Sequence, residues 1–493
     1  MNRGWLALAL AGLGAAPSLA AVVINPFAPI RAGITARIEH FTTVPATRTA
    51  VARTGTQGLK GLNDGSGRLF INDTRGILYV TTSAGGTPTP YLDLRGQYGF
   101  SNSANATQTG LMSFAFHPNF NKDPAKPGYN VFYTIDTTDV NAGVAGWGVP
   151  GAPANHHDVL REWTVADPAA ASATISGMRE VMRIAQPFSD HGPGTIAFNP
   201  SAAEGTSDYG KLYVGLGDGG AVNDPLGSAQ DLTRPFGKIL RIDPADPDGA
   251  GPLAYTIPAD NPFVGQQDAR GEVWAYGLRN PQHFSWSSDG RMFISDIGQA
   301  QIEEVDLGQA GANYGWPVRE GSFAHDNSLN IYDTPANNGL FIDPIAQYDH
   351  EEVQRDGISD LVSIGGAFLY EGSMVKALSG KILLTDLVSG RMFYFDPTDP
   401  ASATGSGLRE LMLTLDDLPT TLRTLEGYGS AKRVDLRLGV DSDGEIYMLT
   451  KGYGDIYRFL FTSVPEPASW AMALLGFGAV GAALRRRPRF ART

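Results

Sequence analysis

The body of the chain, from residue 22 to 463, repeats one pattern of polar and hydrophobic positions. A polar turn containing glycine leads into a short alternating or apolar run, and another turn follows. Turns of this kind followed by β-branched or aromatic residues are typical of β-hairpins. Helical periodicity is nearly absent here, while 60 Gly and 32 Pro supply turns along the chain, so the pattern predicts an all-β fold. The clearest examples are Gly65–Ile71, Tyr209–Val214, Asp289–Ile294, Ser389–Tyr394 and Asp443–Met448.

The spacing of these hairpins also bears on architecture. The unit recurs every several tens of residues, which is typical of the blades of a β-propeller. A propeller protects its sheet edges by arranging its blades in a ring, and loops from every blade surround one central mouth. We therefore expect one domain over residues 22–463, with any chemistry assembled at that mouth from residues far apart in sequence.

The N-terminus differs in composition from this body. Residues 1–20 combine Arg3, an apolar run from Trp5 to about Ala16, and small residues up to Ala20. A basic start, an apolar run and a small-residue cleavage pattern are typical of a secretory signal peptide. The sequence therefore predicts export.

The C-terminus, residues 464–493, has three parts. Val464-Pro465-Glu466-Pro467 precedes an apolar stretch, Ala468–Leu484, and five arginines follow it. The stretch of about 17 residues is near the short limit for a membrane-spanning helix, and its basic flank is expected to stay cytoplasmic. A plain C-terminal membrane anchor is one interpretation.

Together these parts resemble a PEP-CTERM sorting signal. The resemblance implies a sorting protease of the exosortase type as partner and transient insertion of the C-terminal helix into the inner membrane. It also implies a Gram-negative source, with the protein in the periplasm, at the cell surface or outside the cell, and possible membrane attachment through that helix.

The charge of the body narrows the function further. The full chain has 38 basic and 51 acidic residues; without Arg3, the five tail arginines and Glu466, 32 basic and 50 acidic residues remain. Binding of nucleic acid needs basic surface to neutralise phosphates, so this acidic body argues against it. The chain has no cysteine, so stability must come from a large core, to which bound metal would add.

Four groups of segments carry more specific information. In order they are Gln108–Leu111 with Ala115–Phe120; Asp190-His191 with Leu216–Gly220; Gly237–Pro244; and Gly277–Gln282 with Asp296–Gln299 and Asn313–Pro317. Together they resemble the glucose/sorbosone dehydrogenase family, whose members use pyrroloquinoline quinone (PQQ) on a six-bladed β-propeller. The resemblance spans most of the body and implies this fold, a sugar substrate, and PQQ and Ca²⁺ as cofactors.

Two of these segments contain candidate catalytic residues. A histidine beside a carboxylate offers a base that titrates near neutral pH. The resemblance implies that His191 removes the proton of the anomeric hydroxyl, with Asp190 as its partner or as a substrate ligand. A guanidinium at Arg279 would stabilise negative charge on a quinone oxygen, and Asn280 would contact the cofactor. A structural histidine in a turn and a loop-fixing salt bridge are the simpler interpretations.

The acidic segment from Asp296 to Asp306 indicates a cation site. Ca²⁺ prefers several oxygen ligands, including carbonyls from an irregular loop and at least one carboxylate. The resemblance places them at the carbonyls of Gly298, Gln299 and Tyr314 and at the carboxylate of Glu304. A solvated acidic loop is the alternative.

Two neutral side chains complete the predicted site. Gln108 and Asn223 match positions on the substrate side, where amides can pair with sugar hydroxyls. The nearby run Asp218-Gly219-Gly220 can equally be explained by turn formation alone.

The sequence differs from the family pattern at one place. Members of the family bind the cofactor carboxylates with a lysine and two closely spaced arginines, but here Val388 occupies the lysine position. Arg433 and Arg437 are imperfect substitutes for the arginine pair. PQQ carries three carboxylates, and burying them with few cations is costly.

The sequence therefore predicts an exported PQQ-dependent dehydrogenase that oxidises the anomeric carbon of an aldose or oligosaccharide to a lactone. Two alternatives stay open. One is a non-catalytic, calcium-binding propeller that binds extracellular polysaccharide or protein, and the other is a calcium-dependent lactonase.

Overall fold

The computed structural model describes residues 21–49, 52–102, 108–246, 253–326, 328–333, 339–350, 362–427 and 433–461. The predicted signal peptide and the C-terminal segment 464–493 lie outside these residues. Within them, no helix has the length and apolar character that crossing a membrane requires.

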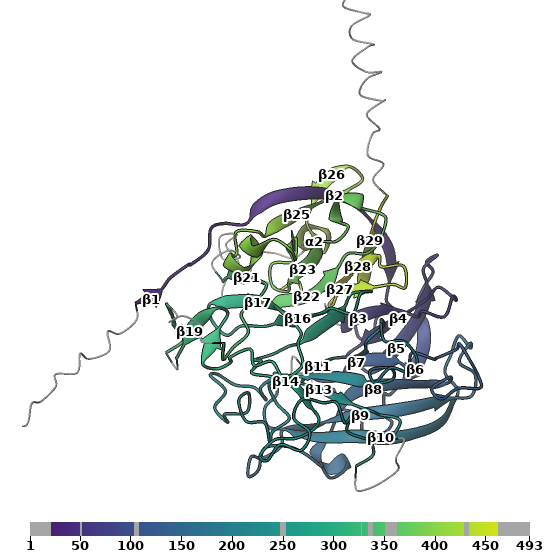
Figure 1. Ribbon diagram of the computed structural model, residues 1–493. Coiled ribbons are helices and arrows are strands. Elements are labelled where there is room, and N and C mark those ends of the chain that lie inside the picture. The colour runs from purple at the N-terminus through teal and green to yellow at the C-terminus, as the bar shows by residue number, and fades with distance from the viewer. Residues whose placement is uncertain are drawn as a thin grey trace, which may run out of the picture.

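The recurring element is a four-stranded antiparallel unit, and successive units follow one another along the chain (Figure 1). The first three units are β3 (Thr56–Gly61), β4 (Arg68–Asp73), β5 (Ile77–Thr82) and β6 (Thr89–Asp93); β7 (Leu111–Phe116), β8 (Val131–Thr138), β9 (His156–Val165) and β10 (Ile175–Gln186); and β11 (Pro193–Phe198), β12 (Leu212–Leu216), β13 (Lys238–Ile242) and β14 (Val273–Tyr276).

The later units have the same form. They are β15 (His283–Trp286), β16 (Met292–Asp296), β17 (Ile302–Leu307) and β21 (Ala346–Asp349); β22 (Ile364–Leu369), β23 (Ile382–Asp386), β24 (Met392–Phe395) and β25 (Arg409–Leu415); and β27 (Leu436–Val440), β28 (Ile446–Thr450), β29 (Asp455–Phe459) and β2 (Arg31–Thr43). The last of these units joins both ends of the body, because β2 comes from its N-terminal end and pairs antiparallel with β29.

Smaller elements decorate these units. A minor sheet contains β1 (Val22–Val23), β20 (Ile331–Tyr332), β19 (Phe323–His325) and β18 (Arg319–Glu320), and β26 (Leu418–Thr420) pairs with β25. The described helices are short: η1 (Val140–Ala142), η2 (Lys376–Leu378), η3 (Pro400–Thr404) and α2 (Leu422–Leu425). The all-β prediction is therefore confirmed.

The glycine turns explain where the strands begin. Each of the five predicted hairpin segments forms a strand: β4, β12, β16, β24 and β28. Gly290 and Gly444 adopt φ of 86° and 79°, a left-handed conformation that glycine reaches without a Cβ penalty. The turn residues and the strand pattern thus agree.

The core lies between neighbouring units rather than inside one of them. Hydrophobic clusters combine residues of adjacent units, such as Leu160 with Leu240 and Leu383 with Leu436. A strand covered on both faces must be hydrophobic on both, and all five residues of β23 are buried. The first strands of successive units contact one another in the order β3, β7, β11, β15, β22, β27, and β27 pairs in parallel with β3. This arrangement is of the β-propeller type.

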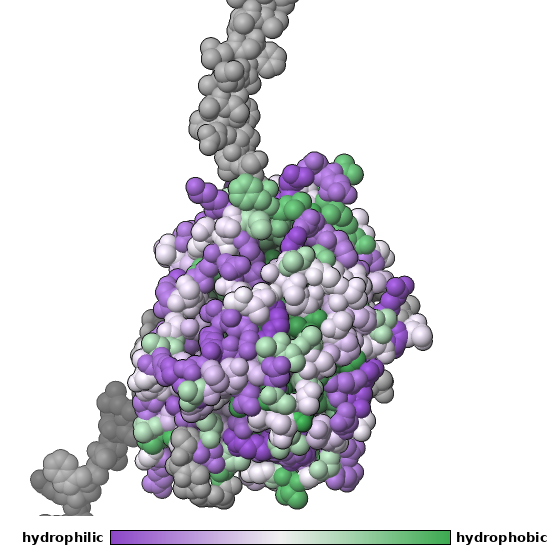
Figure 2. Space-filling model, turned by 90° about the vertical axis from the view of Figure 1, so that its right-hand side faces the viewer, coloured by the Kyte–Doolittle hydropathy of each residue, from purple (hydrophilic) through white to green (hydrophobic). Residues whose placement is uncertain are grey.

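One face of the molecule is drawn in Figure 2. Hydrophilic residues predominate on this face, and hydrophobic residues are dispersed, more densely near the top of the view. Burial of apolar side chains between the units thus leaves this face largely polar.

Candidate functional site

The predicted site residues lie on loops that lead into the innermost strands. His191 precedes β11, Arg279 and Asn280 precede β15, and Arg433 precedes β27. The loops also touch one another, because the amide of Asp218 donates to the carbonyl of Arg279 at 2.7 Å. Residues far apart in the sequence therefore meet at one end of the innermost strands.

His191 is held by a buried carboxylate. Its Nδ1 lies 2.7 Å from Oδ1 of Asp218, and Trp316 donates its indole N–H to the other oxygen, Oδ2, at 2.8 Å. A carboxylate accepts, so Nδ1 carries the proton and Nε2 is left to act as a base. His191 has φ of 49°, a left-handed conformation that is uncommon for such a residue and that clusters at functional sites.

The partner of His191 is not the one that the sequence indicated. The Asp190 carboxylate accepts instead from the amide of Ala221 at 3.4 Å, and the Asp190 carbonyl accepts from Gln186. Of the two roles expected for Asp190, the contact with His191 belongs instead to Asp218, because adjacent side chains in this turn point to different neighbours, and the role as a substrate ligand stays a prediction. The sequence could not distinguish a turn role for Asp218 from a bond across 27 residues.

Arg279 lies beside this group. Its guanidinium is 5.6 Å from the ring centre of Trp316, and its Nη1 donates to the carbonyls of Ile297 and Gly298 at 2.9 and 2.7 Å. The amides of Arg279 and Asn280 donate to the two oxygens of Asp296 at 2.8 and 2.6 Å. Asp296 thus fixes the backbone of the loop, while the guanidinium bonds to two neutral carbonyls and forms no ion pair within the described residues, so its charge is available to an anion nearby.

Two buried atoms of this loop have no hydrogen-bond partner among the described residues. They are Nε of Arg279 and Oδ1 of Asn280. Buried polar atoms are normally paired, and unpaired ones call for a ligand, an ion or a water. They mark a place where a polar ligand would be satisfied.

A face of buried carboxylates follows the same loop. Asp296 and Glu304 are opposite each other on β16 and β17, and Asp306 lies two residues further along the strand. Burial first, and repulsion among these groups second, raise the pKa of Glu304 and of Asp306 well above their usual ranges. Both oxygens of Asp306 are unpaired within the described part of the chain. A nearby cation would relieve this repulsion.

Two of the predicted calcium ligands, Gly298 and Gln299, lie in the loop that leads into β17, the strand of Glu304, and one predicted carbonyl ligand already accepts a hydrogen bond. The Gly298 carbonyl accepts from Arg279. The Gln299 amide and the three after it donate to Oε1 of Glu320 at 2.8–3.0 Å. Tyr314 is buried, and its hydroxyl donates to the Leu307 carbonyl. Among the described residues no three His, Cys, Asp or Glu side chains converge on a metal position. A cation here would need carbonyl oxygens in addition to Glu304.

The two predicted substrate-side amides are close to the site. The Asn223 amide donates to Oε1 of Gln299 at 2.7 Å, and the two side chains also bond to each other. The carbonyl of Gln108 lies against Gly192, next to His191. Oε1 of Gln108 is buried without a partner in the described ranges.

A group of cations completes this end of the molecule. Arg433 and Arg437 bond to one carboxylate, Asp435, at 2.9 and 3.3 Å, and Arg437 also contacts Gln282 and His283. Burial raises the pKa of Asp435, but the attraction of Arg433, Lys451 and Arg437 outweighs it and holds that pKa below its usual range. We call these three basic residues the cation group. The sequence did not indicate Lys451, which only the fold brings to Asp435.

Val388 occupies the position at which the family has a lysine, and the cation Arg423 lies nearby. Val388 is buried, and its carbonyl accepts from Nη2 of Arg423 at 2.6 Å. Arg423 lies on α2, 35 residues away, and its Nε donates to the Ser389 carbonyl at 3.2 Å. Asp435 bonds directly to Arg433 and Arg437, while Asp386 and Glu303 act electrostatically on Arg433 and Asp73 acts on Lys451. The cation group and Arg423 are thus the basic residues that could hold an anionic cofactor at this end, where Val388 replaces the lysine.

Comparisons with known proteins agree with this geometry. Residues 56–458 match the model of the Glucose / Sorbosone dehydrogenase family. The HIPL1 protein of Arabidopsis thaliana is 29% identical over 433 residues, which cover 80% of this chain and 60% of that protein. Aldose sugar dehydrogenase YliI of Escherichia coli is 35% identical over 112 residues, 22% of this chain and 26% of that enzyme.

A solved structure supports the fold. The PQQ-bound aldose sugar dehydrogenase of Streptomyces coelicolor has a TM-score of 0.55 at 21% identity, covering 88% of this chain and 99% of that one. Residues 463–487 match the PEP-CTERM protein-sorting motif, as the sequence predicted. The chain is therefore a member of the glucose/sorbosone dehydrogenase family that carries a PEP-CTERM sorting motif at its C-terminal end.

Proposed function

We propose that the protein is an exported, PQQ-dependent and calcium-binding dehydrogenase that oxidises the anomeric carbon of an aldose or oligosaccharide to a lactone. The observation that supports this proposal is the junction of the loops of His191 and Arg279 through Asp218 and Trp316, with Asp296 joining the Arg279 loop to the strand pair that carries Glu304. Family membership supports sugar dehydrogenase chemistry in general. The substrate class, the cofactors and the residue roles are part of the proposal.

The roles follow from the contacts. PQQ, when bound, would supply the two-electron acceptor. Nε2 of His191 takes the proton of the anomeric hydroxyl, while Asp218 holds the ring and stabilises the imidazolium that forms. Arg279 and Asn280 would contact the cofactor, and the guanidinium would offer positive charge where negative charge develops. Arg433 and Arg437 of the cation group would hold the cofactor carboxylates.

The remaining predicted residues bind substrate and metal in this proposal. Gln108, Asn223 and Asp190 pair with sugar hydroxyls. Glu304, with carbonyls of Gly298, Gln299 and Tyr314, holds Ca²⁺, and the unrelieved repulsion around Glu304 supports a cation there. Because the Gly298 carbonyl oxygen already accepts from Arg279, it would have to contact both the guanidinium and Ca²⁺.

The architecture in this proposal is a closed, six-bladed propeller. Its support is the chain of contacts from β3 through β27 and back to β3, together with the strand β2 that joins both ends of the body. The sorting motif supports export in a Gram-negative bacterium and recognition by an exosortase-type system.

The test is reconstitution of the purified exported protein with PQQ and Ca²⁺. We expect cofactor absorbance and reduction of a redox dye with at least one aldose. His191→Gln should lower kcat by about 10²–10⁴-fold while PQQ still binds. Absence of both cofactor binding and dye reduction over a broad aldose panel would refute the proposal.

Val388 favours a second candidate function, a non-catalytic propeller that keeps calcium for structure. This candidate predicts that Ca²⁺ raises the Tm while PQQ does not. A ligand that binds only the folded state raises stability by RT ln(1 + [L]/Kd). Titrations of Tm with each ligand alone therefore separate the two functions.

A further inference from the structure

A cavity runs along the innermost strands. Its volume is about 450 Å³, and its lining extends from the first residues of β3, β7, β11 and β15 to the loops that follow these strands. His191 and Arg279 precede such strands, whereas Phe198–Pro200 and Trp286 are near the strand ends. The cavity thus begins beside the cation group, since Gln282 and His283 line it and contact Arg437, and it continues to the far ends of the strands. Its volume is in the range of small-molecule sites.

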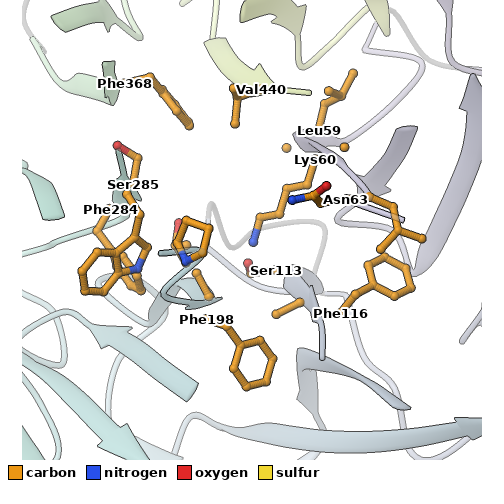
Figure 3. A pocket seen from close by; sticks show the side chains of 18 of the residues that line it. Leu59, Lys60, Asn63, Ser113, Phe116, Phe198, Phe284, Ser285, Phe368 and Val440 are labelled. Atoms are coloured by element: carbon orange, nitrogen blue, oxygen red, sulfur yellow. The ribbon is translucent and has the colours of Figure 1, made fainter. Parts of the chain in front are cut away.

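Lys60 supplies the charge of this cavity. Its side chain extends into the space that the labelled residues surround (Figure 3). Nζ donates to the carbonyls of Phe114 on β7 and Ile196 on β11, at 2.6 and 2.8 Å. Within the described residues, no Asp or Glu forms an ion pair with Lys60. An ammonium has three N–H donors, so one remains for a ligand.

The other ionisable groups around the cavity do not supply the missing anion. Both oxygens of Glu371 accept from Ser288, and Asp441 accepts from its own turn and from Tyr447. Burial lowers the pKa of His117 to about 4 and that of His283 well below its usual range, so both rings are neutral at pH 7. Lys122 at the rim is basic.

The walls are mainly aromatic and aliphatic. Phe116, Phe198, Phe284 and Phe368 surround the cavity with Val440, which is the parallel neighbour of Lys60. Apolar walls favour an apolar body on the ligand, and one buried cation favours one negative charge. The two requirements together describe an amphiphilic monoanion.

We propose that this cavity binds an organic monocarboxylate with an aromatic or aliphatic body, with the carboxylate against Nζ of Lys60. Such a ligand completes the hydrogen bonding of Lys60 and fills the apolar space. Lys60 is not one of the residues proposed to hold the cofactor or to oxidise the sugar. Binding of the carboxylate is measured without PQQ, so its failure is distinguishable from failure of the proposed dehydrogenase activity.

The proposal carries a pH signature. Burial lowers the pKa of Lys60 from 10.5 to about 7. The carboxylate binds the protonated amine, so above pH 7 binding must take up a proton, and affinity should fall by roughly tenfold per pH unit. Below pH 7 the lysine is already charged. His117 and His283 stay neutral above pH 6, so neither histidine accounts for a change in affinity above pH 7.

The test uses calorimetric titration of the exported protein with 4-phenylbutyrate, and with 4-phenylbutyramide as its neutral match. We expect one saturable site for the acid, at least tenfold weaker binding of the amide, and proton uptake at pH 8. Lys60→Met should weaken acid binding at least tenfold. Lys122→Met, which removes a lysine at the rim, should change it less than threefold.

A second variant guards against misfolding of the first. Val440→Phe fills the cavity from the neighbouring strand β27 and leaves Lys60 in place, and it should abolish binding with an unchanged circular dichroism spectrum. The proposal is overturned if the protein does not bind 4-phenylbutyrate, if acid and amide bind equally, or if folded Val440→Phe retains full affinity.

Discussion

Among single residues, Asp218 controls how His191 can act. It accepts from Nδ1 of His191 and from the indole of Trp316, so the ring is fixed with Nε2 free. In Asp218→Asn an amide replaces the acceptor, and the imidazolium loses its stabilising charge. We expect kcat to fall on the order of 10²-fold with little change in KM, measured by dye reduction with the reconstituted enzyme.

Asp190→Asn is the matched control for this prediction. Its carboxylate accepts from the amide of Ala221 and does not contact His191. We expect KM to change more than kcat, as a substrate ligand would require. Equal losses of kcat in both variants would contradict the assigned positioning role of Asp218.

At the scale of single residues the sequence predicted candidate residues but not their contacts. Family resemblance named His191, Arg279, Asn280 and Glu304 as members of one site, and their roles stay a prediction. The contact between Asp218 and Trp316 spans 98 residues. Nothing in local pattern predicts such a pair, because it depends on how two separate loops meet.

Among the elements, the loop between β16 and β17 depends on one side chain. Oε1 of Glu320 accepts from the amides of residues 299–302, at 2.8–3.0 Å. Gly298 allows the same tight turn, since a Cβ there would collide with the carbonyl of Ile302. Glu320 is thus the anchor that presents Gln299 and the Gly298 carbonyl to the site.

Glu320→Ala should therefore leave four amides without their acceptor. We expect the free energy of unfolding to fall by about 1–3 kcal/mol and calcium affinity to fall by roughly 10–100-fold. Urea unfolding and calcium-dependent Tm measure the two effects. Glu320→Gln keeps the accepting oxygen and should retain most of both; if it behaves like the alanine variant, the anchoring role is wrong.

The sequence predicted the positions of the strands better than it predicted the side-chain contacts of the site. Glycine turns and apolar runs correctly marked β4, β12, β16, β24 and β28, because hairpins are local in the chain. The anchor at Glu320 escaped notice, since β18 belongs to a minor sheet that has no repeat pattern. Local signals therefore define strands, while the loops between them depend on distant partners.

For the whole molecule, the pairing of the two ends of the body is the feature that the repeat pattern could not show. Strand β2 pairs antiparallel with β29 and parallel with β25, and Figure 1 shows it along the edge of both. Ala36 and Ile38 on β2 are buried in the cluster that includes Leu438 and Phe459. The repeated hairpin pattern predicted the four-stranded units. The sequence around β2 contains no turn signal that would assign this strand to the last unit, β27–β29.

The last unit should accordingly depend on the N-terminal strand for stability. Removing residues 21–43 deletes β2, exposes the edge of β29 and uncovers its hydrophobic cluster, so we expect a lower Tm and aggregation on heating. Removing only residues 21–30 deletes β1, which pairs with the short strand β20, and should change the Tm little. Adding a synthetic peptide of residues 31–43 to the longer deletion should restore part of the lost Tm, because the edge of β29 is its template. Equal Tm values for the two deletions would show that β2 does not hold the ends of the body together.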